Sequence, residues 1–272
     1  MSAHEFVKTV PDAPPGFFQA EADGLRWLAE PGAVPVVRVI RVDDSALVLE
    51  RLTETDAPTP QVAREFGRRL AALHAAGAPG FGWVPSERAW FGPLSDPLDV
   101  QAVPRDSFTE FWVTDRLRPM AERAAPLLDV RAREAVAAAI DAVATGVFAE
   151  IAGQSEEAPA RVHGDLWAGN VMWTERGGTL IDPSAHGGHP LEDLALLALF
   201  GAPQLREIFA GYAAARAEQG RDLPSGWEAD LPAHQLYCLL AHVVLFGTGY
   251  AAQTVAAARA VTARGRALAA AR

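Results

Sequence analysis

The segment from His163 to Pro183 constrains the fold more than any other part of this 272-residue chain. It begins with HGDLWAGN, continues with the apolar run Val171-Met172-Trp173, and crosses a glycine pair before a second apolar run that ends at Asp182. This order predicts a loop that presents Asp165 and Asn170, then a β-hairpin, and then a second carboxylate at the end of the far strand.

Phosphoryl transfer from Mg-ATP needs this set of side chains. Asp165 would orient an acceptor hydroxyl and take its proton, while Asn170 and Asp182 would hold the Mg²⁺ that neutralises the phosphates. The spacing Asp-x4-Asn equals that of the kinase loop H-R-D-x-x-x-x-N, with Gly164 in place of the arginine. The alternative is that Asp165 and Asn170 only cap turns, as Asp and Asn commonly do. The second acid on the same hairpin favours the kinase interpretation.

Composition excludes several other classes of protein. Half of the residues are hydrophobic and 21% are charged, so the chain can bury a full core. The net charge of -10 argues against a nucleic-acid-binding surface, and the single cysteine, Cys238, excludes a disulfide framework. The N-terminus has no apolar signal core, and the apolar stretch 236–252 is interrupted and falls short of the ~20 residues of a membrane span. We therefore expect a soluble, cytoplasmic protein with no nucleic-acid and no membrane partner.

The hydrophobic periodicity predicts an α+β fold with two lobes, a small β-containing lobe and a larger, mostly helical one. In the small lobe we expect strands over residues 5–10, 34–42 and 46–52, and a helix over 17–30. In the large lobe we expect helices over 60–77, from a capping box at Ser107, over 136–151 with a stop at Gly153, and after Asp193, with a loop over 78–106. The two lobes are assigned to residues 1–53 and 54–272.

The motif residues resemble those of the fructosamine-3-kinase (ketosamine-3-kinase) family, which has the aminoglycoside-phosphotransferase-like kinase fold. The resemblance rests on the segments 163–173, 181–189 and 193–201, and it extends over nearly the whole chain, including Phe6-Val7-Lys8. Tryptophan after leucine in H-G-D-L-W-x-G-N distinguishes this family from the aminoglycoside and choline kinases. The resemblance implies a kinase that uses ATP and Mg²⁺ to phosphorylate the 3-hydroxyl of ketosamines, on a protein or a small amine, and so repairs glycation.

The resemblance also assigns roles in nucleotide binding. Lys8, the only lysine in the chain, corresponds to the strand lysine that contacts the α/β-phosphates. Glu21 corresponds to the acid that forms an ion pair with that lysine. The backbone of Glu50, Arg51 and Leu52 corresponds to the hinge between the lobes, which hydrogen-bonds the adenine.

Further roles concern the substrate and the loop that carries the motif. Trp167 could stack on the sugar or on the carrier of the amine, or it could be a buried packing residue. His186 and His189 could donate hydrogen bonds to sugar hydroxyls, or they could fix the glycine-rich segment around them. We expect His163 to hydrogen-bond backbone near the second acidic strand, and Asp193 to fasten either the segment around His186 and His189 or the motif loop.

This sequence departs from the family pattern at two places. The chain begins almost at the lysine strand, so the glycine-rich hairpin that precedes it in the family has no counterpart here. Either the start of the sequence is assigned too far downstream, or the protein binds ATP in an open-topped cleft, for which we expect weaker phosphate binding. Pro190-Leu191 stands where the family has Arg-Glu.

Three alternatives therefore stay open. They are a kinase for another amino-sugar or aminoglycoside-like substrate, a pseudokinase that binds nucleotide weakly, and a metal hydrolase with His163, Asp165, His186 and His189 as ligands. For the leading interpretation the partner is a small ketosamine or a glycated protein, and the protein is expected to be a monomer.

Overall fold

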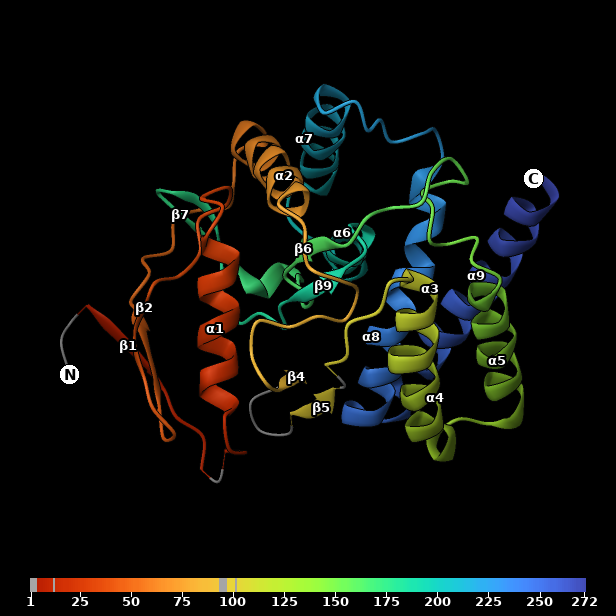
Figure 1. The fold of residues 1–272 in the computed structure, drawn as a ribbon, viewed down its shortest axis with the longest axis horizontal. Coiled ribbons are helices and arrows are strands. Elements are labelled where there is room, and N and C mark those ends of the chain that lie inside the picture. The colour runs from red at the N-terminus through yellow and green to blue at the C-terminus, as the bar shows by residue number, and fades with distance from the viewer. Residues whose placement is uncertain (1–3, 12, 93–96, 101) are drawn as a thin grey trace.

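The computed structural model describes residues 4–11, 13–92, 97–100 and 102–272. Figure 1 shows a small lobe of strands and one helix at one end of the long axis and a helical lobe at the other, with the two termini at opposite ends.

The small lobe contains a three-stranded antiparallel sheet with one helix packed beside it (Figure 1). Its elements are β1 (Glu5–Lys8), α1 (Phe17–Ala29), β2 (Val39–Val42) and β3 (Leu47–Glu50), and the strand order is β1-β3-β2. The Asp43 carboxylate accepts hydrogen bonds from the backbone of Ser45 and Ala46, which closes the predicted β2–β3 turn. The order of strand, helix and hairpin is as predicted, but β2 is shorter than expected because Pro35 and Val37 pair elsewhere.

Pro35 and Val37 form backbone hydrogen bonds with Leu180 of the large lobe. Val37 N–H donates to Leu180 O at 3.0 Å, and Leu180 N–H donates to Pro35 O at 2.9 Å. Arg161 adds a side-chain link to the end of α1, since its guanidinium donates to Trp27 O and to Glu30. The two lobes are therefore joined by backbone pairing as well as by the connection between β3 and α2 (Pro60–Ala75).

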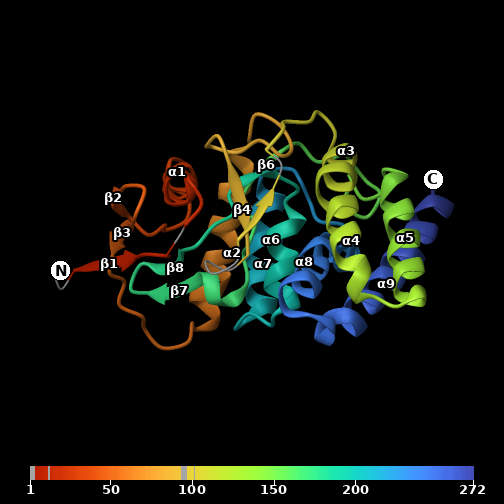
Figure 2. The ribbon, with the colours of Figure 1, turned by 90° about the horizontal axis from the view of Figure 1, so that it is seen from below.

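Two pairs of antiparallel strands at the junction carry the motif segment. β7 (Val171–Thr174) pairs with β8 (Gly177–Leu180), and β6 (Ala160–Val162) pairs with β9 (His186–Gly188). Figure 2 shows the β7–β8 hairpin between the small-lobe sheet and α2 (Pro60–Ala75). The motif loop connects β6 to β7 and includes the single 3₁₀ turn η3 (Ala168–Asn170).

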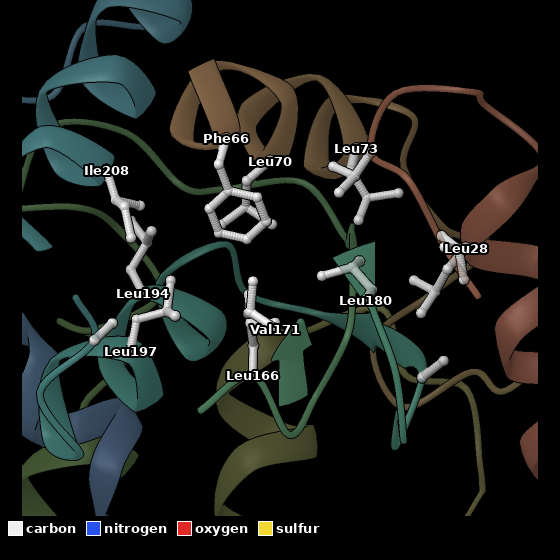
Figure 3. Close-up of a cluster of buried hydrophobic side chains, with 14 of the residues drawn as sticks. Leu28, Phe66, Leu70, Leu73, Leu166, Val171, Leu180, Leu194, Leu197 and Ile208 are labelled. Carbon is white, nitrogen blue, oxygen red and sulfur yellow. The ribbon is translucent and has the colours of Figure 1, made fainter. Parts of the chain in front are cut away.

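One apolar cluster runs from the small lobe through these hairpins into the first helices of the large lobe. Figure 3 shows Leu28 of α1, Leu180 of β8 and Phe66 of α2 within it, together with side chains of α6 (Leu191–Leu199) and α7 (Leu205–Glu218). Apolar packing is thus continuous across residues 53 and 54. The motif strands are fixed from both lobes.

A second apolar cluster holds the remaining helices together. Its buried side chains come mainly from α3 (Phe108–Glu110), the π-helical η1 (Phe111–Leu117), α4 (Arg118–Ala124), α5 (Val130–Ala144), α8 (Leu231–Phe246) and α9 (Ala251–Ala270). The short turns η2 (Ala125–Leu127), η4 (Trp227–Asp230) and η5 (Thr248–Tyr250) flank these helices, and Trp227 of η4 packs in the first cluster. Among the described residues, one stretch, Trp227–Phe246, is long and apolar enough to cross a membrane, but 61% of its most apolar window is buried inside the protein.

The large lobe follows the predicted helices with two corrections. The helix predicted over 136–151 ends at Ala144, because Gly146 takes a φ of +84° and turns the chain well before Gly153. The segment 78–106, predicted to be a loop, contains the hairpin β4 (Ala89–Phe91) and β5 (Leu98–Val100). Burial of Trp90 and Phe91 stabilises this hairpin, although the local sequence carries little strand signal.

Candidate active site

The buried carboxylate of Asp193 holds the motif loop in place by hydrogen bonds. Its Oδ2 accepts a hydrogen bond from His163 N–H at 2.8 Å, and its Oδ1 accepts one from Gly164 N–H at 2.9 Å. The His74 ring lies 3.1 Å from Oδ2. Burial alone would raise the pKa of Asp193, but hydrogen bonding and the nearby histidines outweigh it and hold the pKa below its usual value. Asp193 thus lies where the predicted fastening role requires it.

Gly164 stands where protein kinases have an arginine, and its backbone explains the difference. It takes a φ of +79°, and a Cβ at this position would lie 2.2 Å from Ser184 O. Any larger residue would push the loop away from the segment that follows Asp182.

His163 is fully buried and joins the loop to the end of β8. Its Nε2 lies 2.8 Å from Ile181 O, and its Nδ1 accepts a hydrogen bond from Asp165 N–H. A carbonyl can only accept, so the ring proton is on Nε2. Burial lowers the pKa of His163, which keeps the ring neutral. This is the backbone contact expected from the sequence.

The structure brings Asp165, Asn170 and Asp182 together. Asn170 Nδ2 donates to Asp165 O at 2.8 Å, and it lies 3.3 Å from both Asp165 Oδ2 and Asp182 O. Asp165 is only partly exposed at this point, and burial raises its pKa to about 8. A carboxylate with a raised proton affinity is suited to accept a proton from a hydroxyl.

Lys8 reaches this group from the small lobe. Its Nζ lies 2.7 Å from Glu21 Oε1 and 3.0 Å from Asp182 Oδ1. Burial alone would lower the pKa of Lys8, but the two carboxylates more than offset it, so the pKa is raised and the ammonium keeps its charge. The ion pair with Glu21 agrees with the sequence expectation.

The oxygen donors suit a magnesium ion better than a zinc ion. The Asp182 side chain is 43% exposed, and Asn170 adds a carboxamide oxygen, so the two would offer Mg²⁺ the hard oxygen donors that it prefers. Within the described part of the chain, no three His, Cys, Asp or Glu side chains are grouped to hold a metal. The metal-hydrolase alternative is therefore wrong: both ring nitrogens of His163 and of His186 have hydrogen-bond partners within the protein.

Trp167 lies at the wall of a cavity of about 500 Å³ that opens beside these groups. Its side chain is 41% exposed, so it is not the buried packing residue of the alternative interpretation. The indole lies over Gly169, where a Cβ would lie 2.2 Å from the ring, and its edge meets Phe200 at a centroid distance of 6.0 Å. Gly169 therefore fixes where the ring can lie.

His186 and His189 do not reach this cavity, so the expectation that they contact the substrate is wrong. His186 is 5% exposed, and its Nε2 lies 3.1 Å from Glu192 Oε2. His189 is fully buried and stacks on His234 with ring centroids 4.4 Å apart. Both rings face inward because Glu192 and the helices behind it enclose them, so they fix the segment after Asp182.

The residues assigned to the hinge, Glu50, Arg51 and Leu52, do not line the cavity beside Trp167. The Glu50 carboxylate accepts hydrogen bonds from Arg38 N–H and from the Arg176 guanidinium, and Arg51 N–H donates to His4 O. Their place at the end of β3 agrees with a position between the lobes. The cavity and the hinge are distinct surfaces.

Several cavity residues were missed by the sequence analysis. They are Phe17 of α1, the residues from Val84 to Gly92 other than Glu87, and Phe200, His242, Leu245, Phe246 and Tyr250 of the helical lobe. Two signals could have found some of them. The segment 78–106 is rich in tryptophan, and His242, Phe246 and Tyr250 recur at intervals of four residues.

Known proteins resemble this chain over nearly its whole length. The profile of the fructosamine kinase family matches residues 2–263. A Thermus thermophilus protein named a probable ketoamine kinase is 35% identical over 246 residues, 90% of this chain and 82% of its own length. A Thermobifida fusca crystal structure assigned as a fructosamine-3-kinase has a TM-score of 0.80 and 41% identity, covering 94% of this chain and 85% of its own. An aminoglycoside phosphotransferase solved with AMP-PNP and hygromycin B has a TM-score of 0.61 at 16% identity, covering 97% and 92%, and it shows the kinase-like fold alone.

Proposed function

Because this chain belongs to the fructosamine kinase family, we propose that it transfers the γ-phosphoryl group of Mg-ATP to the 3-hydroxyl of a ketosamine. The observation that carries the proposal is the continuous group of Lys8, Asp165, Asn170 and Asp182, which lines a cavity large enough for a sugar–amine adduct. A ketosamine is a small molecule with several hydroxyls, and the cavity combines few polar groups with apolar walls.

Each polar residue has one task in this mechanism. Asp165 accepts the proton of the attacking hydroxyl, and the Lys8 ammonium, held by Glu21, binds phosphate oxygens of the nucleotide. Asn170 and Asp182 would hold Mg²⁺, which when bound neutralises charge on the phosphates. The hinge backbone at Glu50 to Leu52 would bind the adenine, which leaves the cavity to the acceptor.

The test is product analysis with Mg-ATP and defined fructosamines and ribulosamines. We expect stoichiometric ADP and a sugar phosphorylated at the 3-hydroxyl, identified by ³¹P and ¹³C NMR. Phosphate on another hydroxyl, or turnover of aminoglycosides but no ketosamine, would favour the related-kinase alternative. Hydrolysis of ATP without any phosphorylated sugar would contradict both.

Replacing Asp182 with alanine should weaken Mg²⁺-dependent nucleotide binding. The variant loses a carboxylate of the metal site and one of the two acids that hold Lys8, and we expect ATP affinity with Mg²⁺ to fall at least tenfold. Isothermal titration with and without EDTA measures the metal-dependent part. Unchanged Mg²⁺-dependent affinity would remove Asp182 from the metal site.

Replacing Trp167 with alanine should raise KM for the ketosamine about 5- to 100-fold, with little change in KM for ATP. Loss of a stacking surface costs about 1–3 kcal/mol, and the half-exposed indole contributes little to the free energy of unfolding. Gly169→Ala should act in the same direction, because its methyl group displaces the indole. Equal changes in both KM values with a large fall in Tm would show instead that Trp167 is needed for folding.

A further inference from the structure

A row of aromatic side chains continues from Trp167 along the cavity wall of the helical lobe. Trp167 meets Phe200, and the Phe200 ring centroid lies 5.3 Å from that of His242. His242 in turn lies 5.1 Å from Phe246 and 4.8 Å from Tyr250. All five rings line the cavity. We call these five residues the aromatic row.

The aromatic row leads away from the reacting groups. Trp167 lies two residues from Asp165, whereas Phe246 and Tyr250 come from the end of α8 and from η5. A molecule with its hydroxyl at Asp165 and its sugar on Trp167 would therefore extend its other end along the remaining rings.

The acids that line the cavity lie at the opposite end. Among the described lining residues they are Glu21, Asp165 and Asp182, and all belong to the group around Lys8. One further charged side chain, Arg88, also lines the cavity, but it lies over the Trp90 ring at 5.3 Å and pairs with Asp99 rather than with the aromatic row. The aromatic row carries no acid. His242 is neutral as well: its Nδ1–H donates to Cys238 O at 2.8 Å, and burial lowers its pKa.

The outer rings have apolar surface that a ligand could cover. Phe246 is 55% exposed and Trp167 is 41% exposed, although both border a cavity. Covering exposed aromatic surface with an apolar group is favourable, whereas a charged group here would lose water without gaining an opposite charge.

We propose that the aromatic row is a subsite for the amine carrier, and that the preferred substrates are ketosamines of small aryl or arylalkyl amines. This subsite proposal rests on the proposed function and specifies the class of ketosamine that the enzyme prefers. Edge-to-face contacts between the carrier ring and Phe246 or Tyr250 supply the preference. A lysine adduct would place its charged or peptide groups in the same apolar space.

The test compares ketosamines that share one sugar and differ only in the carrier. We would measure kcat/KM for the adducts of benzylamine, of 2-methoxyethylamine and of Nα-acetyl-lysine. We expect the benzylamine adduct to exceed the other two by at least tenfold. Phe246→Ala should reduce that ratio about tenfold, and Phe246→Leu should reduce it less, because leucine keeps apolar bulk but not the ring. Val130→Ala, at an exposed apolar position on α5, is the matched control and should leave the ratio unchanged.

Calorimetric binding of the benzylamine adduct without nucleotide separates this proposal from the proposed function. If no ketosamine is phosphorylated but this adduct binds in a manner that depends on Phe246, the subsite is supported and the proposed function is wrong. If all three adducts are phosphorylated with equal kcat/KM, or if Phe246→Ala leaves the ratio unchanged, the subsite is wrong and the function stands. If nothing binds or reacts, both are wrong.

Discussion

Replacing Asp165 with asparagine is expected to lower kcat for ketosamine phosphorylation by about 10²- to 10⁴-fold while leaving Mg-ATP affinity largely intact. The carboxamide keeps the shape of the side chain, but it cannot accept the proton of the attacking hydroxyl. Asp165 accepts no hydrogen bond from Lys8, whose partners are Glu21 and Asp182, so the lysine that binds the phosphates keeps both of its carboxylates. Single-turnover kinetics and ATP titration measure the two effects separately. Turnover within about threefold of the wild type would remove Asp165 from the role of base.

The same variant should change how stability depends on pH. Burial raises the pKa of Asp165 to about 8, so the folded protein holds this proton more tightly than the unfolded chain does. Its contribution to the free energy of unfolding is full below pH 4 and is lost as the pH rises toward 8. Because Asp165 is partly exposed, we expect a loss of about 1–3 kcal/mol.

The asparagine carboxamide does not titrate between these pH values. We therefore expect Asp165→Asn to melt at a higher temperature than the wild type at pH 8.5 and at nearly the same temperature at pH 4.5. Thermal unfolding without nucleotide or Mg²⁺ checks this. A difference in Tm between the two proteins that is the same at both pH values would contradict the raised pKa.

The site could be predicted from the sequence where its residues are close in the chain. Asp165, Asn170 and Asp182 lie on one loop and hairpin, so their spacing was enough to place them together. Lys8 is 174 residues from Asp182, and no local pattern joins the two. Only the resemblance to a family placed Lys8 and Glu21 at the site, since their meeting depends on how the small-lobe sheet packs on the hairpin.

The residues that were missed or misassigned depend on tertiary packing. Trp90 becomes part of a strand because its ring packs on Phe17 at a centroid distance of 5.4 Å, a contact that the segment 78–106 does not encode alone. His186 follows Asp182 closely, which suggested a substrate contact, but Glu192 binds its ring and turns it inward. Sequence spacing placed these side chains near the site without showing which way they face.

Replacing Asp193 with alanine is expected to lower the free energy of unfolding by about 3–5 kcal/mol. The side chain is fully buried, and it accepts hydrogen bonds from His163 N–H and Gly164 N–H while contacting the His74 ring. Alanine would leave these buried donors without an acceptor, and each unsatisfied group costs its own desolvation free energy. Asp193→Asn should lower the free energy of unfolding by less than Asp193→Ala does. Its amide oxygen can accept one of the two backbone hydrogen bonds, while its NH₂ group faces the other donor.

Urea unfolding measures this loss, with Asp141→Ala as the control, since Asp141 is exposed on α5 and its loss should cost less than about 0.5 kcal/mol. Asp193 is fully buried and does not line the cavity, so it acts by positioning the loop that carries Asp165. The folded Asp193→Asn protein should therefore lose kcat while its KM for ATP stays close to that of the wild type. If Asp193→Ala unfolds at the same urea concentration as the wild type, the loop is held by other contacts. In that case His163 and Gly164 must find other acceptors, and the left-handed backbone at Gly164 must be fixed by Ser184 and the residues after Asp182.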